Sequence, residues 1–371
     1  MYNKKFIPVA YPYLDSKERS AVNFVVGKKW ITMGKKVRQF EIALAKFLNV
    51  KYVVAMNNGT STLDSLVKYF GIKNSSHEVI IPDLTYISTA NAVTYNNGKI
   101  VLCDSNIDNF NINLNDLKKK ITSKTKLIIV TDMKGMPVDY DEILKIANKK
   151  KIPVISDSAE AIGSIYKNHK VGSQVTAHSF SFYANKNITT GEGGAISTND
   201  KKLYKFLLQI RNQGQSKRYH HVIIGNNYRM TDISASIGIE QLKKIKKIIN
   251  NKNKIANFYN NNFANRNEIM LPSIPQYVSQ HSWYNYSILV SPKIRDKLIN
   301  FLKKNKIETR VSFPTISSQP IYKKLKYRRK ESNSIKLSKS LIDLPIWTML
   351  SLNDVKIVIR SILVFFGDKL K

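Results

Sequence analysis

The chain has 371 residues, 43% of them hydrophobic, and a formal net charge of +34 at pH 7 from 60 lysines and arginines against 26 aspartates and glutamates. Its length predicts one large and one smaller domain, and its single cysteine excludes an internal disulfide, a cysteine-based zinc site and an iron–sulfur cluster built within the chain. The N-terminus lacks the apolar core of a signal peptide and no apolar run is long enough to span a bilayer, so we expect a cytoplasmic protein without a membrane segment.

The positive charge is spread along the chain together with asparagine and isoleucine, as in "LKKIKKIINNKNKIANFYNNNF" at 242–263. This pattern indicates a general enrichment in lysine, asparagine and isoleucine, with the lysines on solvent-exposed faces, rather than one concentrated basic surface. We therefore do not expect nucleic acid as a partner. A basic surface would nevertheless help to attract a phosphorylated small substrate. A non-catalytic regulator or nucleic-acid-binding protein remains an alternative on charge alone.

The first half of the chain alternates short apolar runs with helical patterns. The helical patterns lie at 61–71, 85–97 and 140–151, and the apolar runs lie at 51–56, 78–83, 99–104, 125–132 and 152–157. None of these runs alternates strictly in polarity, which is typical of strands buried on both faces of a parallel sheet. We therefore predict an α/β fold with a mainly parallel sheet covered by helices, in which ligands bind outside the carboxyl ends of the strands.

The later part of the chain changes character. A strand at 179–183 leads through a glycine-rich loop to the apolar run 195–198, and 230–263 is predicted as a long helix or a helix pair. Beyond it, 282–291 is strand-like, whereas 295–306 and 355–367 are helical. We predict a large α/β domain over 1–255, including an N-terminal arm, and a smaller α+β domain over 256–371.

Four features at the predicted strand ends carry polar or aromatic groups. The turn 57–61 directs free backbone N–H groups and hydroxyls at an anion beside a helix N-terminus. Asp157 ends one strand, Tyr86 follows another, and Lys186 lies in the loop after Ser181. Each feature alone fits a helix cap, a turn or the core, but together they match pyridoxal 5′-phosphate. The lysine would form a Schiff base, the carboxylate would keep the pyridine nitrogen protonated, and the ring would stack on the cofactor.

The chain also resembles a known enzyme family nearly from end to end. The matching segments are "WITMGKKVRQFEIALAKFL" (30–48), "NNGTSTLD" (57–64), "IPDLTYISTANAV" (81–93), "DSAEAIGS" (157–164), "SFSFYANKNITTGEGGAIST" (179–198), "GNNYRMTDISASIGIEQL" (225–242) and "IETRVSFPTISSQPIY" (307–322). On these segments the chain resembles the DegT-type nucleotide-sugar aminotransferases, a branch of the fold-type-I pyridoxal-phosphate-dependent transferases. The lysine loop and "SSQPIY" look most like the GDP-perosamine synthase-like members, which aminate C4 of nucleotide-linked 4-keto-6-deoxyhexoses.

The resemblance implies roles for individual residues. Lys186 would form the Schiff base and then move the proton between the sugar C4 and the cofactor C4′. The implied cofactor contacts are Asp157 to the pyridinium, Tyr86 to the ring, Glu160 near the 3′ oxygen, and Gly59, Thr60 and Ser181 to the phosphate. Asn227 would reach the phosphate in the neighbouring subunit, which implies a homodimer with shared active sites. The implied substrate contacts are Tyr183, Arg229, Ser317 and Ser318.

The reaction implied by the resemblance takes an amino group from L-glutamate and delivers it to a 4-keto nucleotide diphospho-sugar. The product would be a 4-amino-4,6-dideoxy sugar of the perosamine or viosamine type, used in glycan biosynthesis. Amination of a 3-keto sugar stays open. Relatives that dehydrate C3 use a histidine in place of the lysine or an added iron–sulfur cluster, so Lys186 and the single cysteine argue against that chemistry.

The chain departs from the family pattern at three positions. Asp132 and Lys134 replace the histidine and tyrosine of a "His-x-Tyr-Gly" segment, and Asn226 replaces a tyrosine. These changes leave the cofactor residues intact but leave the sugar and the amino-donor pocket undefined. The adjacent histidines 220–221 have no partner cluster and, as neighbours in sequence, do not face the same way. We therefore predict no metal site.

Overall fold

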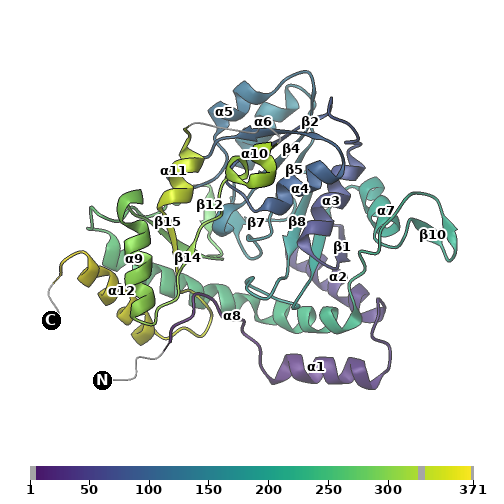
Figure 1. Cartoon of the computed structure of the whole chain (residues 1–371). Coiled ribbons are helices and arrows are strands. Elements are labelled where there is room, and N and C mark those ends of the chain that lie inside the picture. Colours follow the sequence, from purple (N-terminus) through teal and green to yellow (C-terminus); the bar gives the residue numbers. More distant parts are fainter. Residues whose placement is uncertain (1–5, 325–330, 369–371) are drawn as a thin grey trace.

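A seven-stranded sheet forms the centre of the computed structural model, which describes residues 6–324 and 331–368 (Figure 1). Its strands are β1 (Tyr52–Met56), β2 (Glu78–Pro82), β3 (Lys99–Cys103), β4 (Thr125–Thr131), β5 (Val154–Asp157), β8 (Ala177–Ser181) and β9 (Gly194–Thr198). Their order across the sheet is β1-β9-β8-β5-β4-β2-β3. Within this sheet only β9 runs antiparallel to its neighbours, because the loop at 182–193 contains no helix and leads directly from β8 into β9. The predicted mainly parallel sheet is confirmed.

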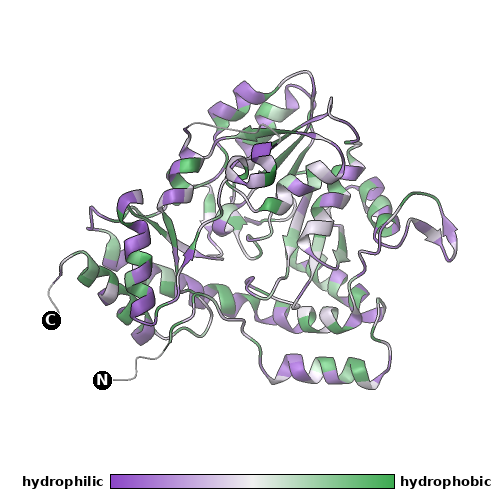
Figure 2. Ribbon diagram, in the orientation of Figure 1, coloured by the Kyte–Doolittle hydropathy of each residue, from purple (hydrophilic) through white to green (hydrophobic). Residues whose placement is uncertain are grey.

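Helices cover both faces of this sheet. They are α2 (Lys35–Leu48), α3 (Gly59–Tyr69), α4 (Ile87–Tyr95), α5 (Leu114–Lys120), α6 (Tyr140–Asn148) and α7 (Lys201–Ile210), with the short 3₁₀ turn η1 (Met133–Gly135) after β4. In β2, Val79 and Ile81 pack into one apolar cluster and Ile80 into another. Since successive side chains point to opposite faces and both faces are buried, the strand has no polar face. Figure 2 shows these apolar strands between helices of mixed polarity.

A single long helix, α8 (Asp232–Phe263), connects the large sheet to a smaller one (Figure 1). Thr231 caps its N-terminus, and the helix is continuous for 32 residues, so the alternative of a helix pair was wrong. Its first half packs against α2 and against α1 (Ser16–Gly27), which lies alongside it. Its second half buries Ile255, Tyr259 and Phe263 in the apolar cluster of the C-terminal part.

The C-terminal part is built on a three-stranded antiparallel sheet in the order β13-β15-β14. Its elements are β13 (Tyr286–Leu289), α9 (Pro292–Lys304), β14 (Arg310–Val311), the 3₁₀ turn η2 (Ile316–Ser318), α10 (Pro320–Lys324), α11 (Asn333–Ser340), β15 (Leu341–Leu344) and α12 (Leu352–Phe365). The expected strand at 282–291 is therefore shorter than predicted. Residues 282–285 lie outside it and pass next to the large sheet, where Tyr284 donates its N–H to the carbonyl of Lys134 over 3.1 Å. The predicted boundary between a large domain (1–255) and a smaller domain (256–371) remains a prediction.

Smaller elements complete the fold. A three-stranded sheet is formed by β6 (Ile165–Tyr166), β7 (His169–Lys170) and β12 (Val278–Gln280), and a hairpin by β10 (Gln215–Lys217) and β11 (His220–His221). The hairpin projects from the body in Figure 1 and exposes both histidines. Across 6–324 and 331–368, no cluster of three or more metal-ligating side chains occurs, and none of the helices is long and apolar enough to traverse a bilayer.

Candidate active site

A cavity of about 510 Å³ opens at the carboxyl ends of the central strands. Its wall is formed by the turn before α3, the start of α4, the end of β5 and the loop between β8 and β9. Eight of the predicted site residues line it: Gly59, Thr60, Tyr86, Asp157, Glu160, Ser181, Tyr183 and Lys186. Because the carboxyl ends of the parallel strands share one edge of the sheet, the structure brings together side chains up to 127 positions apart in sequence.

The turn before α3, which lines the cavity, carries free N–H groups that could bind an anion. Asn58 caps α3 by accepting the N–H of Ser61 over 2.9 Å. The N–H groups of Gly59 and Thr60 lie in the first turn of the helix, where no carbonyl of the helix itself can bind them. A Cβ added to Gly59 would lie 3.0 Å from the Cβ of Ser181, so glycine lets the turn approach β8 closely.

We expect Gly59→Ala to weaken binding of a phosphorylated ligand in the cavity about tenfold. The added methyl group would push the turn away from Ser181 and misdirect its N–H groups. Titration of the protein with pyridoxal 5′-phosphate, followed by absorbance, measures this effect. Gly27→Ala is the matched control because a Cβ at Gly27 has nothing within 4 Å. Equal affinity in the two variants would contradict an anion site at this turn.

Asp157 lines the same cavity and is buried. Its Oδ2 accepts a hydrogen bond from the hydroxyl of Thr89 over 2.7 Å, and its Oδ1 accepts the N–H of Ala159 over 3.3 Å. Burial raises the pKa of Asp157, and these hydrogen bonds offset the effect only partly. In the ranges that the structure covers, no lysine or arginine forms an ion pair with this carboxylate. A positively charged group in the cavity would supply the missing partner.

The amine of Lys186 lies between an acid and an aromatic ring. Its Nζ is 3.6 Å from Oε1 of Glu160 and 4.1 Å from the centre of the Tyr284 ring. Burial by itself would lower the pKa of Lys186, but Tyr284 and Glu160, together with Asp157, raise the pKa above its usual value. A protonated amine would have to lose its proton before acting as a nucleophile or base.

Sequence reasoning missed several residues of this cavity. Tyr284 and Phe313 come from the C-terminal part, and Phe313 packs 5.4 Å from the ring of Tyr86. Glu192 lines the cavity from the loop of Lys186. Thr89 does not line the cavity but binds Asp157. It had a detectable signal, since it follows Tyr86 by three positions at the start of a predicted helix. Tyr284 had none, because it lay in a run that read as a strand.

The four remaining predicted residues do not line the cavity of the single chain. Ser317 donates both its N–H and its hydroxyl to the carboxylate of Asp83, each over 2.8 Å. Ser318 donates its hydroxyl to the carbonyl of Thr315 over 2.7 Å. Arg229 donates to Asn212 over 2.9 Å, and Asn227 is exposed and forms a β-bridge with the same residue.

Two of the three departures from the family pattern are buried away from the cavity. Asp132 accepts hydrogen bonds from Tyr140, Ser156 and Ser158, each shorter than 3 Å. Burial raises its pKa to about 6 in spite of these bonds. Lys134 forms a buried ion pair with Asp343 of β15. Asn226 uses its backbone, donating its N–H to the carbonyl of Ile210 over 2.7 Å.

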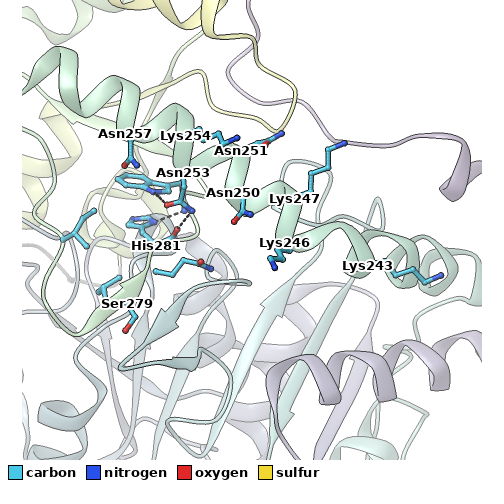
Figure 3. A pocket seen from close by; sticks show the side chains of 14 residues that line it. Lys243, Lys246, Lys247, Asn250, Asn251, Asn253, Lys254, Asn257, Ser279 and His281 are labelled. Atoms are coloured by element: carbon cyan, nitrogen blue, oxygen red, sulfur yellow. Dashed lines mark hydrogen bonds between the residues drawn. The ribbon is translucent and has the colours of Figure 1, made fainter.

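A second, more open hollow of about 870 Å³ lies along α8, on the side of its lysines (Figure 3). Lys246, Lys247 and Lys254 of the helix line it together with His281 and Ser279. The ring of His281 stacks on Trp283 at 4.0 Å, and Trp283 donates its indole N–H to Asn253 over 3.0 Å. No carboxylate lines the hollow, so it lacks the acid and base groups that the smaller cavity brings together.

The smaller cavity fits pyridoxal 5′-phosphate. The turn at Gly59 would hold the phosphate, and the buried Asp157 would face a protonated ring nitrogen. Lys186 supplies an amine within the same cavity, and Tyr86 supplies an exposed aromatic face. These groups match the phosphate, the basic nitrogen, the aldehyde and the flat ring of this cofactor.

Comparisons with known proteins agree with this fit. The model of the DegT/DnrJ/EryC1/StrS aminotransferase family matches residues 12–363. GDP-perosamine synthase of Escherichia coli O157:H7 is 37% identical over 98% of this chain and 100% of its own length. An aminotransferase involved in the biosynthesis of pseudoaminic acid in Helicobacter pylori superimposes with a TM-score of 0.93 at 30% identity, covering 98% of this chain and 99% of the other. The Streptococcus pneumoniae protein Spr1654 in its PMP form superimposes with a TM-score of 0.92 at 27% identity, covering 98% and 100%.

Proposed function

Because the chain belongs to the DegT/DnrJ/EryC1/StrS aminotransferase family, and is thus a pyridoxal-phosphate-dependent sugar aminotransferase, we propose that it aminates C4 of a nucleotide-linked 4-keto-6-deoxyhexose. L-glutamate would donate the amino group and leave as 2-oxoglutarate. The product would be a 4-amino-4,6-dideoxy sugar of the perosamine or viosamine type for glycan biosynthesis. We further propose that the protein works in the cytoplasm as a homodimer, in which Asn227 of each subunit reaches the phosphate site of the other.

The observation that carries the proposed site is the placement of Lys186 and Asp157 in one buried cavity. The carboxylate has no cationic partner in the described part of the chain, and the amine approaches from the loop between β8 and β9. When bound, pyridoxal 5′-phosphate carries the amino group between donor and sugar and withdraws electrons from the reacting carbon. Resemblance to the GDP-perosamine synthase described above supports a 4-keto sugar as the acceptor.

The residues of the cavity have separable tasks in this proposal. Lys186 Nζ takes the proton from the reacting carbon of the amino donor and delivers a proton to the sugar C4. Glu160, at 3.6 Å, stabilises the protonated amine between these two transfers. Asp157 keeps a positive charge at the ring nitrogen, because a buried carboxylate favours a cation beside it. The rings of Tyr86 and Phe313 exclude water from the cavity mouth.

We expect the purified protein, given ¹⁵N-labelled L-glutamate, to aminate at least one nucleotide 4-keto-6-deoxyhexose from a panel with GDP, UDP and dTDP. The GDP-linked sugar is the first candidate. Mass spectrometry detects the label in the product, and NMR coupling of ¹⁵N to the ring protons shows whether the amine is at C4 or C3. A parallel panel of nucleotide 3-keto-6-deoxyhexoses tests the alternative, because transamination places the amine on the carbon that carried the ketone. Label in that panel alone would favour a 3-keto sugar aminotransferase. The absence of any labelled sugar, with cofactor bound, would refute the proposed acceptor class.

A further inference from the structure

Lys134 occupies an unusual position between the two parts of the chain. It lies in the 3₁₀ turn after β4 with φ 60°, a left-handed conformation that is strained for a non-glycine residue. The next residue, Gly135, has φ 91°, and a Cβ there would lie 2.3 Å from the hydroxyl of Ser282 and 2.9 Å from the carbonyl oxygen of Glu160. The turn is thus wedged between the loop of Glu160 and the segment that carries Tyr284.

The side chain of Lys134 is fixed by a buried ion pair with the smaller sheet. Its Nζ lies 2.9 and 2.8 Å from the two carboxylate oxygens of Asp343 in β15, and the side chains are only 3% and 4% exposed. Asp343 also accepts hydrogen bonds from Asn285 over 2.8 Å and from Ser287 over 2.6 Å. Such a fully bonded pair is strongly destabilising to break, since either partner alone would be an uncompensated buried charge.

The main chain of the same residue holds both neighbours of the Lys186 amine. The N–H of Lys134 donates to Oε2 of Glu160 over 2.7 Å, while Oε1 of that carboxylate faces Lys186. The carbonyl of Lys134 accepts the N–H of Tyr284 over 3.1 Å, and the ring of Tyr284 lies beside Lys186. One residue therefore connects, through three different groups, the small sheet, the acid and the aromatic ring.

A second buried lysine holds the same segment from the other side. Lys252 of α8 donates to the carbonyl of Tyr284 over 3.1 Å and to Oδ1 of Asn187 over 2.7 Å. Asn187 is the neighbour of Lys186 in sequence. The backbone of Tyr284 is thus bound at its N–H by Lys134 and at its carbonyl by Lys252, and the N–H contact depends on the turn after β4.

We propose that the Lys134–Asp343 pair is a positioning element of the active site, which clamps the turn after β4 to the small sheet and thereby fixes Glu160 and Tyr284 around the amine of Lys186. Neither side chain lines the cavity, although the Nζ of Lys134 lies 5.4 Å from the centre of the Phe313 ring, which does. The task of the pair is to hold the acid and the aromatic ring beside the amine. This inference rests on the proposed role of Lys186, and its test includes a measurement on the cofactor-free protein that does not depend on catalysis.

The test uses three variants: Lys134→Met, Asp343→Asn and the double variant that combines them. Each is compared with a control variant, Glu142→Gln. The last change breaks the exposed ion pair between Glu142 and Lys145 on α6 and is the matched control. Trace acetylation of the cofactor-free protein, with peptide mass spectrometry, measures how fast Lys186 reacts as a function of pH. We expect Lys186 to react about tenfold faster at neutral pH in the three variants, because the displaced carboxylate no longer holds the amine charged. Cofactor-loaded protein should show a shifted pH dependence of its absorption spectrum.

The double variant separates positioning from stability. Each single variant is expected to lower the thermal midpoint because it leaves one buried charge unpaired, and the double variant should recover part of that loss. The reactivity of Lys186 should not recover, since the clamp is still missing. Reactivity equal to that of Glu142→Gln, or recovery together with the thermal midpoint, would overturn the inference. A changed reactivity with no change in the spectrum of the loaded protein would instead count against the proposed role of Lys186.

Discussion

Lys186→Ala is expected to reduce the transamination rate by about 10⁴-fold or more. The variant lacks both the amine that would bind the cofactor covalently and the base that would move the proton. The cavity should still bind pyridoxal 5′-phosphate, because the turn at Gly59 and the carboxylate of Asp157 are untouched. Stopped-flow absorbance with L-glutamate measures the rate, and the spectrum of the bound cofactor should be that of the free aldehyde.

A small amine added to the solution shows whether Lys186→Ala is slow because it lacks the proton-transferring amine or because the active site is no longer folded correctly. Methylamine fits the space vacated by the side chain, so we expect it to restore part of the proton-transfer rate in Lys186→Ala as its concentration rises. Lys145→Ala serves as the control, since that lysine is exposed on α6 and forms an ion pair with Glu142 on the surface. An Ala variant with wild-type spectrum and rate would show that another amine of the chain is used.

Asp157→Asn is expected to slow the reaction about 10²–10³-fold, with the fold and most of the cofactor affinity retained. The amide has the same shape, and the hydroxyl of Thr89 can turn to accept a hydrogen bond from it instead of donating one. The change removes only the negative charge, so a protonated ring nitrogen would lose its partner. Single-turnover rates with L-glutamate, together with the pH dependence of the spectrum, measure the effect.

Thr89→Val tests whether charge or geometry dominates at Asp157. It removes the 2.7 Å hydrogen bond but leaves the carboxylate in place. We expect a loss of about tenfold, the cost of one hydrogen bond to a charged group. If Thr89→Val were as slow as Asp157→Asn, the orientation of the carboxylate rather than its charge would be the decisive property.

Much of the large sheet could be predicted because its signals are local. The uninterrupted apolar runs form strands buried in the sheet. Each observed strand begins and ends within two residues of the predicted run. The single reversed strand, β9, could not be predicted from its composition, since it is as apolar and as buried as its neighbours. Its direction follows from the loop at 182–193, which contains no crossover helix and returns the chain next to the strand it has just left.

The sequence by itself determined the edge at which the site forms and the groups contributed by strand ends, namely Asp157, Gly59 and Lys186. In a parallel sheet these ends meet whatever the connecting helices contain. Only the tertiary structure decided which of the 60 lysines and arginines are buried and what they bind. Lys134 finds Asp343 after 209 positions, and Tyr284 reaches Lys186 from the C-terminal part. Such contacts depend on how the two parts pack against each other. Contacts between residues far apart in the chain produce no periodic pattern of residue types in the sequence.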